Sequence, residues 1–69
     1  MFDPRPEGAK LLSQAIFALG LSNEDAARSI GVDRSSLWYW LTGRRLPSVT
    51  KLRQIEKWSK GKVPAASWL

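Results

Sequence analysis

The chain has 69 residues, contains neither cysteine nor histidine, and carries a formal net charge of +5. A domain of this size buries only about 60% of the surface of its unfolded chain, which leaves little room for a deep catalytic pocket. The missing Cys and His side chains exclude disulfides, thiolate chemistry, the usual zinc sites and the commonest general base. We therefore expect one domain, residues 1–69, that is not an enzyme and holds no metal or cofactor.

The charge is divided unevenly along the chain. Residues 1–33 carry three basic and five acidic side chains, a net charge of −2, whereas residues 34–69 carry eight basic side chains and one acidic, a net charge of +7. A polyanion such as DNA is the natural partner of the basic half, although small basic proteins without nucleic-acid function exist. The apolar runs are too short for a signal peptide or a membrane span, so we expect a cytoplasmic protein.

The periodicity predicts an all-α bundle of four to five short helices. Residues 1–6 hold two prolines and are expected to form an extended lead-in, from which Phe2 could fold back on the core. A helix is expected from about Glu7 to the glycine at position 20, which takes the usual place after a helix end. Its inward stripe at helical spacing is Leu11, Leu12, Ala15, Ile16 and Leu19.

Residues 22–43 predict two short helices separated by a glycine turn. Ser22 is a good N-cap for a helix that starts at Asn23, and Asp25 can serve as a short capping-box acid. Gly31 ends this helix because glycine adopts the positive φ that a sharp turn needs, and Asp33 is expected to cap the next helix. The predicted inward residues of the first helix are Ala26, Ala27 and Ile30.

The helix predicted over residues 34–42 divides into two faces when its residues are placed at 100° intervals. The inner face holds Ser36, Leu37, Trp40 and Leu41, and the outer face holds Arg34, Ser35, Trp38, Tyr39 and Thr42. We expect the inner face to anchor the helix in the core. The outer face carries long side chains with hydrogen-bonding groups.

The remainder of the chain predicts a basic loop and two further helices. Ser48 is the expected N-cap of a helix over residues 49–59, and Pro64 begins a short final helix. The inward residues of the first of these are expected to be Val49, Leu52, Ile55 and Trp58. Trp68 and Leu69 are expected to be apolar anchors that cover the core, with a dimer contact as the alternative.

Two short helices, a glycine-centred turn, a second capped helix and a basic loop followed by proline make up a helix-turn-helix motif. The sequence resembles the phage Cro and repressor class over roughly residues 9–63, and Ile55–Val63 also resembles a stretch of Cro-like and YdaS-like members. The residues that carry the resemblance are Ala27, Gly31, Val32, Leu37, Trp40, Leu41, Thr42, Gly43, Arg44, Leu46 and Pro47.

The resemblance implies which residues contact DNA. In this class the base-reading side chains occupy the first two positions of the second motif helix and positions one turn further on. Here those positions are Arg34, Ser35, Trp38 and Tyr39. The class also implies phosphate contacts from the start of the first motif helix and from the basic residues flanking the second, here Asn23, Arg44, Arg45 and Lys51.

Several of these residues have an alternative interpretation. Arg34 suits the O6 and N7 atoms of guanine, but a surface arginine paired with Asp33 is the plainer interpretation. Trp38 departs from the class, which usually has a smaller polar residue there, and it could contact thymine methyls or sugars, fold onto the helix over 49–59, or lie in a protein interface. Tyr39 could bind a base edge or a phosphate, or be structural. We expect Arg53 and the neighbouring lysines to keep a helix face solvated.

The sequence thus predicts a sequence-specific transcriptional regulator, repressor-like, that binds double-stranded DNA as a homodimer in a bacterial cell or phage-infected host. The alternative is a protein-interaction module or antitoxin-type domain that keeps the same fold and binds a protein partner. In that alternative Trp38, Tyr39 and Trp68 would form the contact surface.

Overall fold

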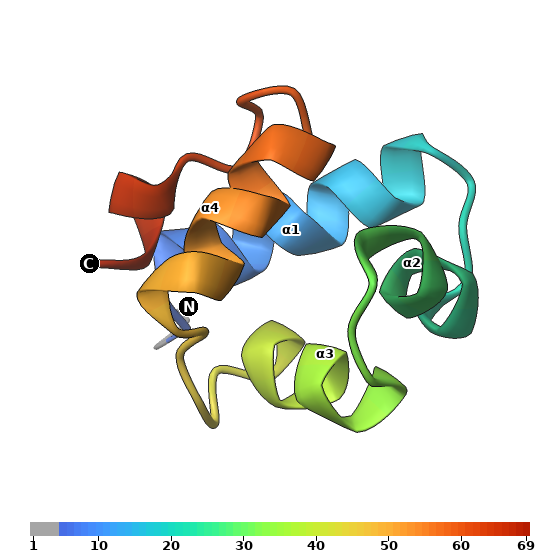
Figure 1. Ribbon diagram of the computed structural model, residues 1–69, viewed down its shortest axis with the longest axis horizontal. Helices are drawn as coiled ribbons and strands as arrows, with labels where there is room; N and C mark the ends of the chain where they lie inside the picture. The colour runs from blue at the N-terminus through green and yellow to red at the C-terminus, as the bar shows by residue number, and fades with distance from the viewer. Residues whose placement is uncertain (1–4) are drawn as a thin grey trace, which may run out of the picture.

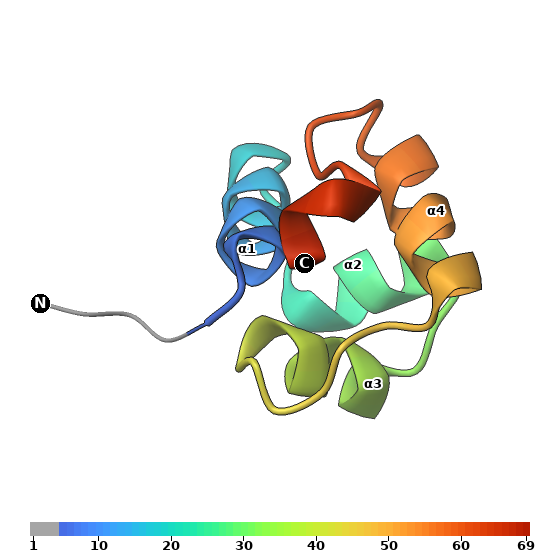
Figure 2. The same ribbon diagram turned by 90° about the vertical axis from the view of Figure 1, so that its left-hand side faces the viewer.

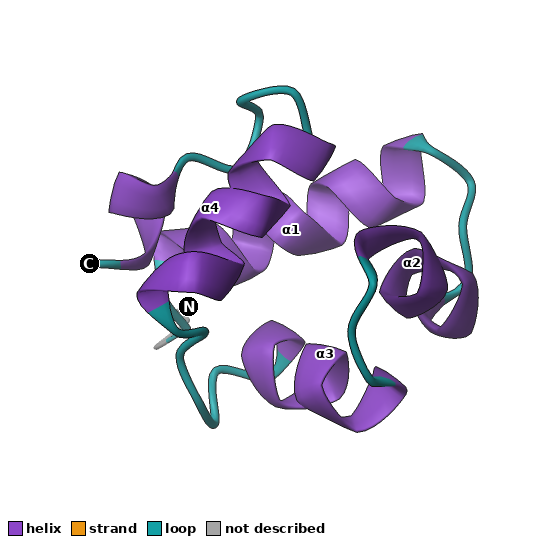
Figure 3. Cartoon of the chain, viewed as in Figure 1, coloured by secondary structure: helices purple, strands orange, loops and turns teal. Residues whose placement is uncertain are grey.

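The computed structural model describes residues 5–69, which fold into four α-helices and a short 3₁₀ helix (Figures 1 and 3). The elements are α1 (Glu7–Ala18), α2 (Asn23–Ile30), α3 (Arg34–Leu41), α4 (Val49–Trp58) and η1 (Ala65–Trp68). This architecture confirms the predicted all-α bundle. The expectations for residues 1–4, Phe2 included, lie outside the described residues.

The helix ends follow local chemistry for the most part. The Oγ atoms of Ser22 and Ser48 accept hydrogen bonds from the backbone N–H groups of Asp25 and Lys51, at 3.1 and 3.3 Å. Such bonds satisfy amides that have no partner within the helix. Asp33 occupies the N-cap position of α3, but its side chain makes no capping hydrogen bond. The predicted position of the N-cap is therefore confirmed, but the predicted capping by the Asp33 side chain is wrong.

The core forms where four helices and the end of the chain meet. Helix α3 packs against α2 and α1, and η1 packs against both α1 and α4 (Figure 2). The buried apolar side chains are Ala9, Leu12, Ala15, Ile16, Ala26, Ala27, Ile30, Leu37, Trp40, Leu41, Leu52, Ile55, Val63 and Trp68. The predicted inner residues of α2 and the large apolar residues predicted for α3 are thus all buried.

Three predicted core residues are exposed, and each lies at the end of an element. Leu19 is the C-cap residue of α1 and is 59% exposed, Val49 is the first residue of α4 and is 66% exposed, and Leu69 ends the chain at 99%. A side chain at the end of an element has fewer neighbours around it than one in the middle, and Leu19 only borders a hollow that it shares with the end of α4. Trp68, by contrast, is 2% exposed, so it covers the core and is not available for a dimer contact.

The end of the chain is held against α1 by a close backbone approach. Trp68 packs on Gly8 so tightly that a Cβ atom at Gly8 would lie 2.3 Å from Cδ2 of the indole. The backbone N–H of Ala65 donates to Oε1 of Glu56 at 3.2 Å, which ties the start of η1 to α4. No helix among the described residues has the length and apolar character needed to cross a membrane.

Candidate nucleic-acid interface

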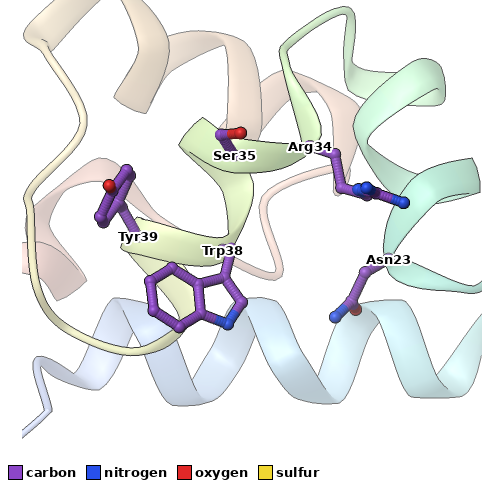
Figure 4. A pocket seen from close by; sticks show the side chains of 5 residues that line it. All are labelled: Asn23, Arg34, Ser35, Trp38 and Tyr39. Atoms are coloured by element: carbon purple, nitrogen blue, oxygen red, sulfur yellow. The ribbon is translucent and has the colours of Figure 1, made fainter.

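The outer face of α3 borders an open hollow of about 370 Å³ whose other wall is the start of α2. Five of the eight residues predicted to contact DNA line this hollow: Asn23, Arg34, Ser35, Trp38 and Tyr39. Figure 4 shows the side chains of Asn23 and Arg34 projecting into the space between the two helices, with the indole nitrogen of Trp38 on the side facing Asn23. The structure therefore brings the predicted base-reading face and one predicted phosphate contact together.

The turn between α2 and α3 sets the position of Asn23 relative to α3. Gly31 has φ +92°, and its N–H and that of Val32 both donate to the carbonyl of Ala27 at 2.9 Å. This left-handed turn is one that glycine enters without steric cost. The side-chain amide of Gln54 donates to the carbonyl of Ile30 at 2.5 Å, so α4 holds the end of α2 in place.

The end of α3 turns the chain back over its own outer face. Gly43 has φ +77°, its N–H donates to the carbonyl of Trp40 at 3.2 Å, and the N–H of Arg44 donates to the carbonyl of Tyr39 at 3.0 Å. These two bonds form a Schellman motif. The N–H of Arg45 also donates to the carbonyl of Tyr39, at 3.3 Å. Both arginines are therefore attached to the last turn of α3.

Each of these arginines lies over an aromatic ring of α3. The guanidinium carbon of Arg44 is 5.0 Å from the centroid of the Trp38 ring, and that of Arg45 is 4.7 Å from the centroid of Tyr39. The two rings meet edge to face, with centroids 5.3 Å apart and an interplanar angle of 69°. The predicted phosphate contacts Arg44 and Arg45 are thus joined to the outer face of α3.

The cations of this face are not neutralised by acidic side chains of the described residues. Within that part of the chain, an exposed ion pair of 3.8 Å joins Arg28 to Glu24, whereas Arg34, Arg44 and Arg45 take part in none. The alternative in which Arg34 pairs with Asp33 is therefore not the arrangement observed. Trp38 remains 45% exposed on the outer face.

Lys51 lies apart from the hollow next to Asn23. It lines a second hollow on the other side of the turn, together with Gly31, Asp33 and Ser36, and its Nζ atom donates to Oε1 of Gln54 at 3.5 Å. Of the eight predicted contacts, Lys51 is therefore the one that the structure does not group with the others.

Arg5 lies beside this face, a contact that the sequence analysis above does not predict. Its Nη1 atom donates to the carbonyl of Leu41 at 3.1 Å, and its side chain lies so near Gly43 that a Cβ there would be 3.1 Å from Cγ of Arg5. The segment before α1 thereby supports the C-terminal end of α3. The contact joins residues 36 positions apart, and no local pattern signals it.

Comparison with known families is consistent with this geometry. A family model described as Helix-turn-helix matches residues 9–57, which is most of the chain. No match was found among curated proteins or among solved structures. The matched span includes α2, α3 and nearly all of α1 and α4, and therefore the hollow and both arginines that lie over the rings of α3. The chain belongs to the Cro/C1-type helix-turn-helix family, a family of DNA-binding regulators whose members are generally not enzymes.

Proposed function

We propose that the protein is a sequence-specific transcriptional regulator, repressor-like, that binds double-stranded DNA with α3 in the major groove. The observation that carries this proposal is the outer face of α3, where the hollow lined by Asn23, Arg34, Ser35, Trp38 and Tyr39 adjoins Arg44 and Arg45. A major groove about 12 Å wide admits one α-helix, and the flanking cations suit the phosphates at its edges.

Arg34 and Ser35 are the proposed base-reading residues of the first turn. Both are exposed, and Arg34 has no ion pair within residues 5–69 that would compete with a base. A guanidinium group can donate two parallel hydrogen bonds to O6 and N7 of guanine, a contact worth about 1–3 kcal/mol of discrimination. Trp38 and Tyr39, one turn further on, line the same hollow as Arg34 and Ser35.

The proposed phosphate contacts lie on both sides of the hollow. Asn23 and the free amides of the α2 N-terminus face one strand, since a helix N-terminus favours anions. Arg44 and Arg45 follow α3 and face the other strand. Lys51 is half-buried and bonded to Gln54, so we propose for it the weakest contact of this set.

Selection of bound sites from random duplexes tests base reading, followed by affinity measurements with Arg34→Ala. We expect a defined consensus sequence. Arg34→Ala should lose about 1–3 kcal/mol of preference at one base pair, while base changes elsewhere in the site should affect its binding as they affect that of the wild type. Arg53→Ala is the matched control, because Arg53 is an exposed arginine on α4 outside the hollow. Equal weakening of Arg34→Ala on every sequence would instead assign Arg34 to the phosphates.

The salt dependence of binding tests the phosphate contacts. The logarithm of the binding constant should fall linearly with the logarithm of salt concentration, and Arg45→Ala should lower the magnitude of that slope by about 1. The physical reason is that each neutralised phosphate releases condensed counterions. A wild-type affinity that does not change with salt would refute DNA binding.

We further propose that two copies bind two half-sites about one helical turn apart, as a two-fold arrangement requires. A palindromic consensus and a complex of two chains per duplex in sedimentation would be the expected results. In the protein-interaction alternative, Trp68 cannot contact a partner because it is only 2% exposed. Phe17 on α1, which is 87% exposed, could provide an apolar contact instead. Binding that requires a protein and no DNA would favour that alternative.

A further inference from the structure

Trp38 and Tyr39 lie on the outer face of α3. Hydrogen bonding to base edges does not explain why both of these residues have large aromatic rings. Each carries a guanidinium group over its ring, Arg44 over Trp38 and Arg45 over Tyr39. We infer that these two aromatic residues are positioning residues, which hold Arg44 and Arg45 in the orientation that contacts the DNA phosphates. This inference rests on the proposed function. It means that the two rings contribute to the affinity for DNA more than to the preference for one DNA sequence.

A stacked arginine keeps its hydrogen-bonding edge free. The guanidinium group is planar, and its five N–H donors point outward in that plane. An aromatic ring attracts a cation through its face, and a guanidinium that lies flat on the ring keeps these in-plane donors free. The guanidinium carbons of Arg44 and Arg45 lie 5.0 and 4.7 Å from the ring centroids, within cation–π distance, and N–H groups that do not point at the rings can donate to phosphate oxygens.

The backbone and the rings restrict the arginines together. The amides of Arg44 and Arg45 both donate to the carbonyl of Tyr39, and Gly43 supplies the positive φ that directs the chain back over α3. The rings then restrict the arginine side chains, which otherwise have among the largest rotamer entropies of all side chains. An arginine ordered before binding loses less conformational entropy when it meets a phosphate.

The same geometry argues against a stacking platform for unpaired bases. Arg44 covers a face of the Trp38 ring, and Tyr39 meets that ring at 69° with centroids 5.3 Å apart. A base could take the place of Arg44 only by displacing it, which would remove a cation from the DNA. The arrangement therefore suits an intact duplex, whose phosphates meet the arginines while its bases stay paired.

The first test is made on the free protein by NMR. Stacking on an indole should shift the side-chain protons of Arg44 upfield, and Trp38→Leu should return them to their ordinary positions while Trp38→Phe retains part of the shift. Trp38 is 45% exposed, so we expect both variants to fold, and thermal unfolding checks this. Arg44 proton shifts that are ordinary in the wild type would overturn the inference without affecting the proposed function.

The second test is a double-mutant cycle on DNA affinity with Trp38→Leu and Arg44→Ala. Trp38→Leu should weaken binding about 2- to 5-fold, the range of an exposed cation–π contact, and equally on consensus and altered duplexes. In the Arg44→Ala background the same substitution should have almost no effect, because the side chain it positions is gone. Trp38→Phe should recover part of the affinity.

The matched control is the cycle of Trp38→Leu with Arg34→Ala. Arg34 lines the same hollow and carries the same charge, but it does not stack on Trp38. The two losses should therefore add. If Trp38→Leu keeps its full effect in the Arg44→Ala background, or changes preference at one base pair, Trp38 reads bases and the inference is wrong. Wild-type protein without salt-dependent duplex binding would overturn the proposed function and this inference with it.

Discussion

Replacement of Gly8 by alanine tests how closely the end of the chain packs on α1. A Cβ atom at Gly8 would lie 2.3, 2.4 and 2.5 Å from three atoms of the Trp68 indole. Carbon atoms in contact prefer about 3.5–4.0 Å, so the ring or the helix must move by more than an ångström. Overpacking of this kind costs about 1–3 kcal/mol, which outweighs the gain of up to about 1 kcal/mol from replacing glycine by alanine in a helix.

We therefore expect Gly8→Ala to lower the free energy of unfolding by about 1–2 kcal/mol in urea denaturation. For a domain of this size the melting temperature should fall by about 4–8 °C per kcal/mol. The sign of the effect should reverse in a Trp68→Ala background, because the clash disappears while the helix preference of alanine remains. Gly8→Ala would then be neutral to stabilising.

Gly20→Ala is the matched control for this cycle. Gly20 has φ +70°, and no atom lies within 4 Å of a Cβ built there. Gly20→Ala should therefore lower the free energy of unfolding by about 1–2 kcal/mol, only because alanine disfavours the left-handed backbone. That cost should be the same with and without Trp68. A Gly8→Ala variant that is as stable as wild type would refute the packing argument, as would a Gly8→Ala effect that does not depend on Trp68.

The remaining predictions concern the core, the N-caps of α2 and α3, and the C-terminal end of α3. Leu37→Ala should cost about 2–5 kcal/mol in thermal unfolding, because Leu37 is fully buried; a loss below about 1 kcal/mol would contradict its place in the core. Ser22→Ala should cost about 1 kcal/mol, since it removes a capping bond, whereas Asp33→Ala should cost clearly less, since Asp33 makes none; equal losses would show that Asp33 caps α3 in solution. Arg5→Ala should destabilise by about 1 kcal/mol and speed amide exchange in the last turn of α3, whose carbonyl at Leu41 it leaves without this donor. Unchanged exchange there would argue against support from the N-terminal segment.

The elements that sequence analysis predicted well are those set by short-range interactions. The capping bonds of Ser22 and Ser48 span three residues, and the positive φ of Gly31 is a property of glycine itself. The two faces of α3 follow from the helical period, and Leu37 and Trp40 are buried while Arg34 and Ser35 are exposed. These features need no knowledge of the rest of the fold.

The errors arose where a local pattern met an element end. The same period that correctly marked Leu52 and Ile55 also marked Val49, which is the first residue of α4 and is 66% exposed. Leu69 and Trp68 are adjacent and both apolar, yet one is exposed and the other buried, because only Trp68 meets the open backbone of Gly8. Helical periodicity predicts the direction in which a side chain points. It does not predict whether another element lies there to bury that side chain.

At the candidate site, the helical period of the sequence predicts which residue types stand on the outer face of α3, and the composition predicts the basic loop that follows. Three further features depend on how the helices pack: Asn23 lies across a hollow from Arg34, Arg5 supports the end of α3, and Lys51 lines a different hollow. The stacks of Arg44 and Arg45 on rings of α3 belong to this second group, although their partners are only six residues away. The physical reason is that the helical period and backbone preferences act within a few residues. Contacts between side chains depend on how turns and helix packing bring separate segments together.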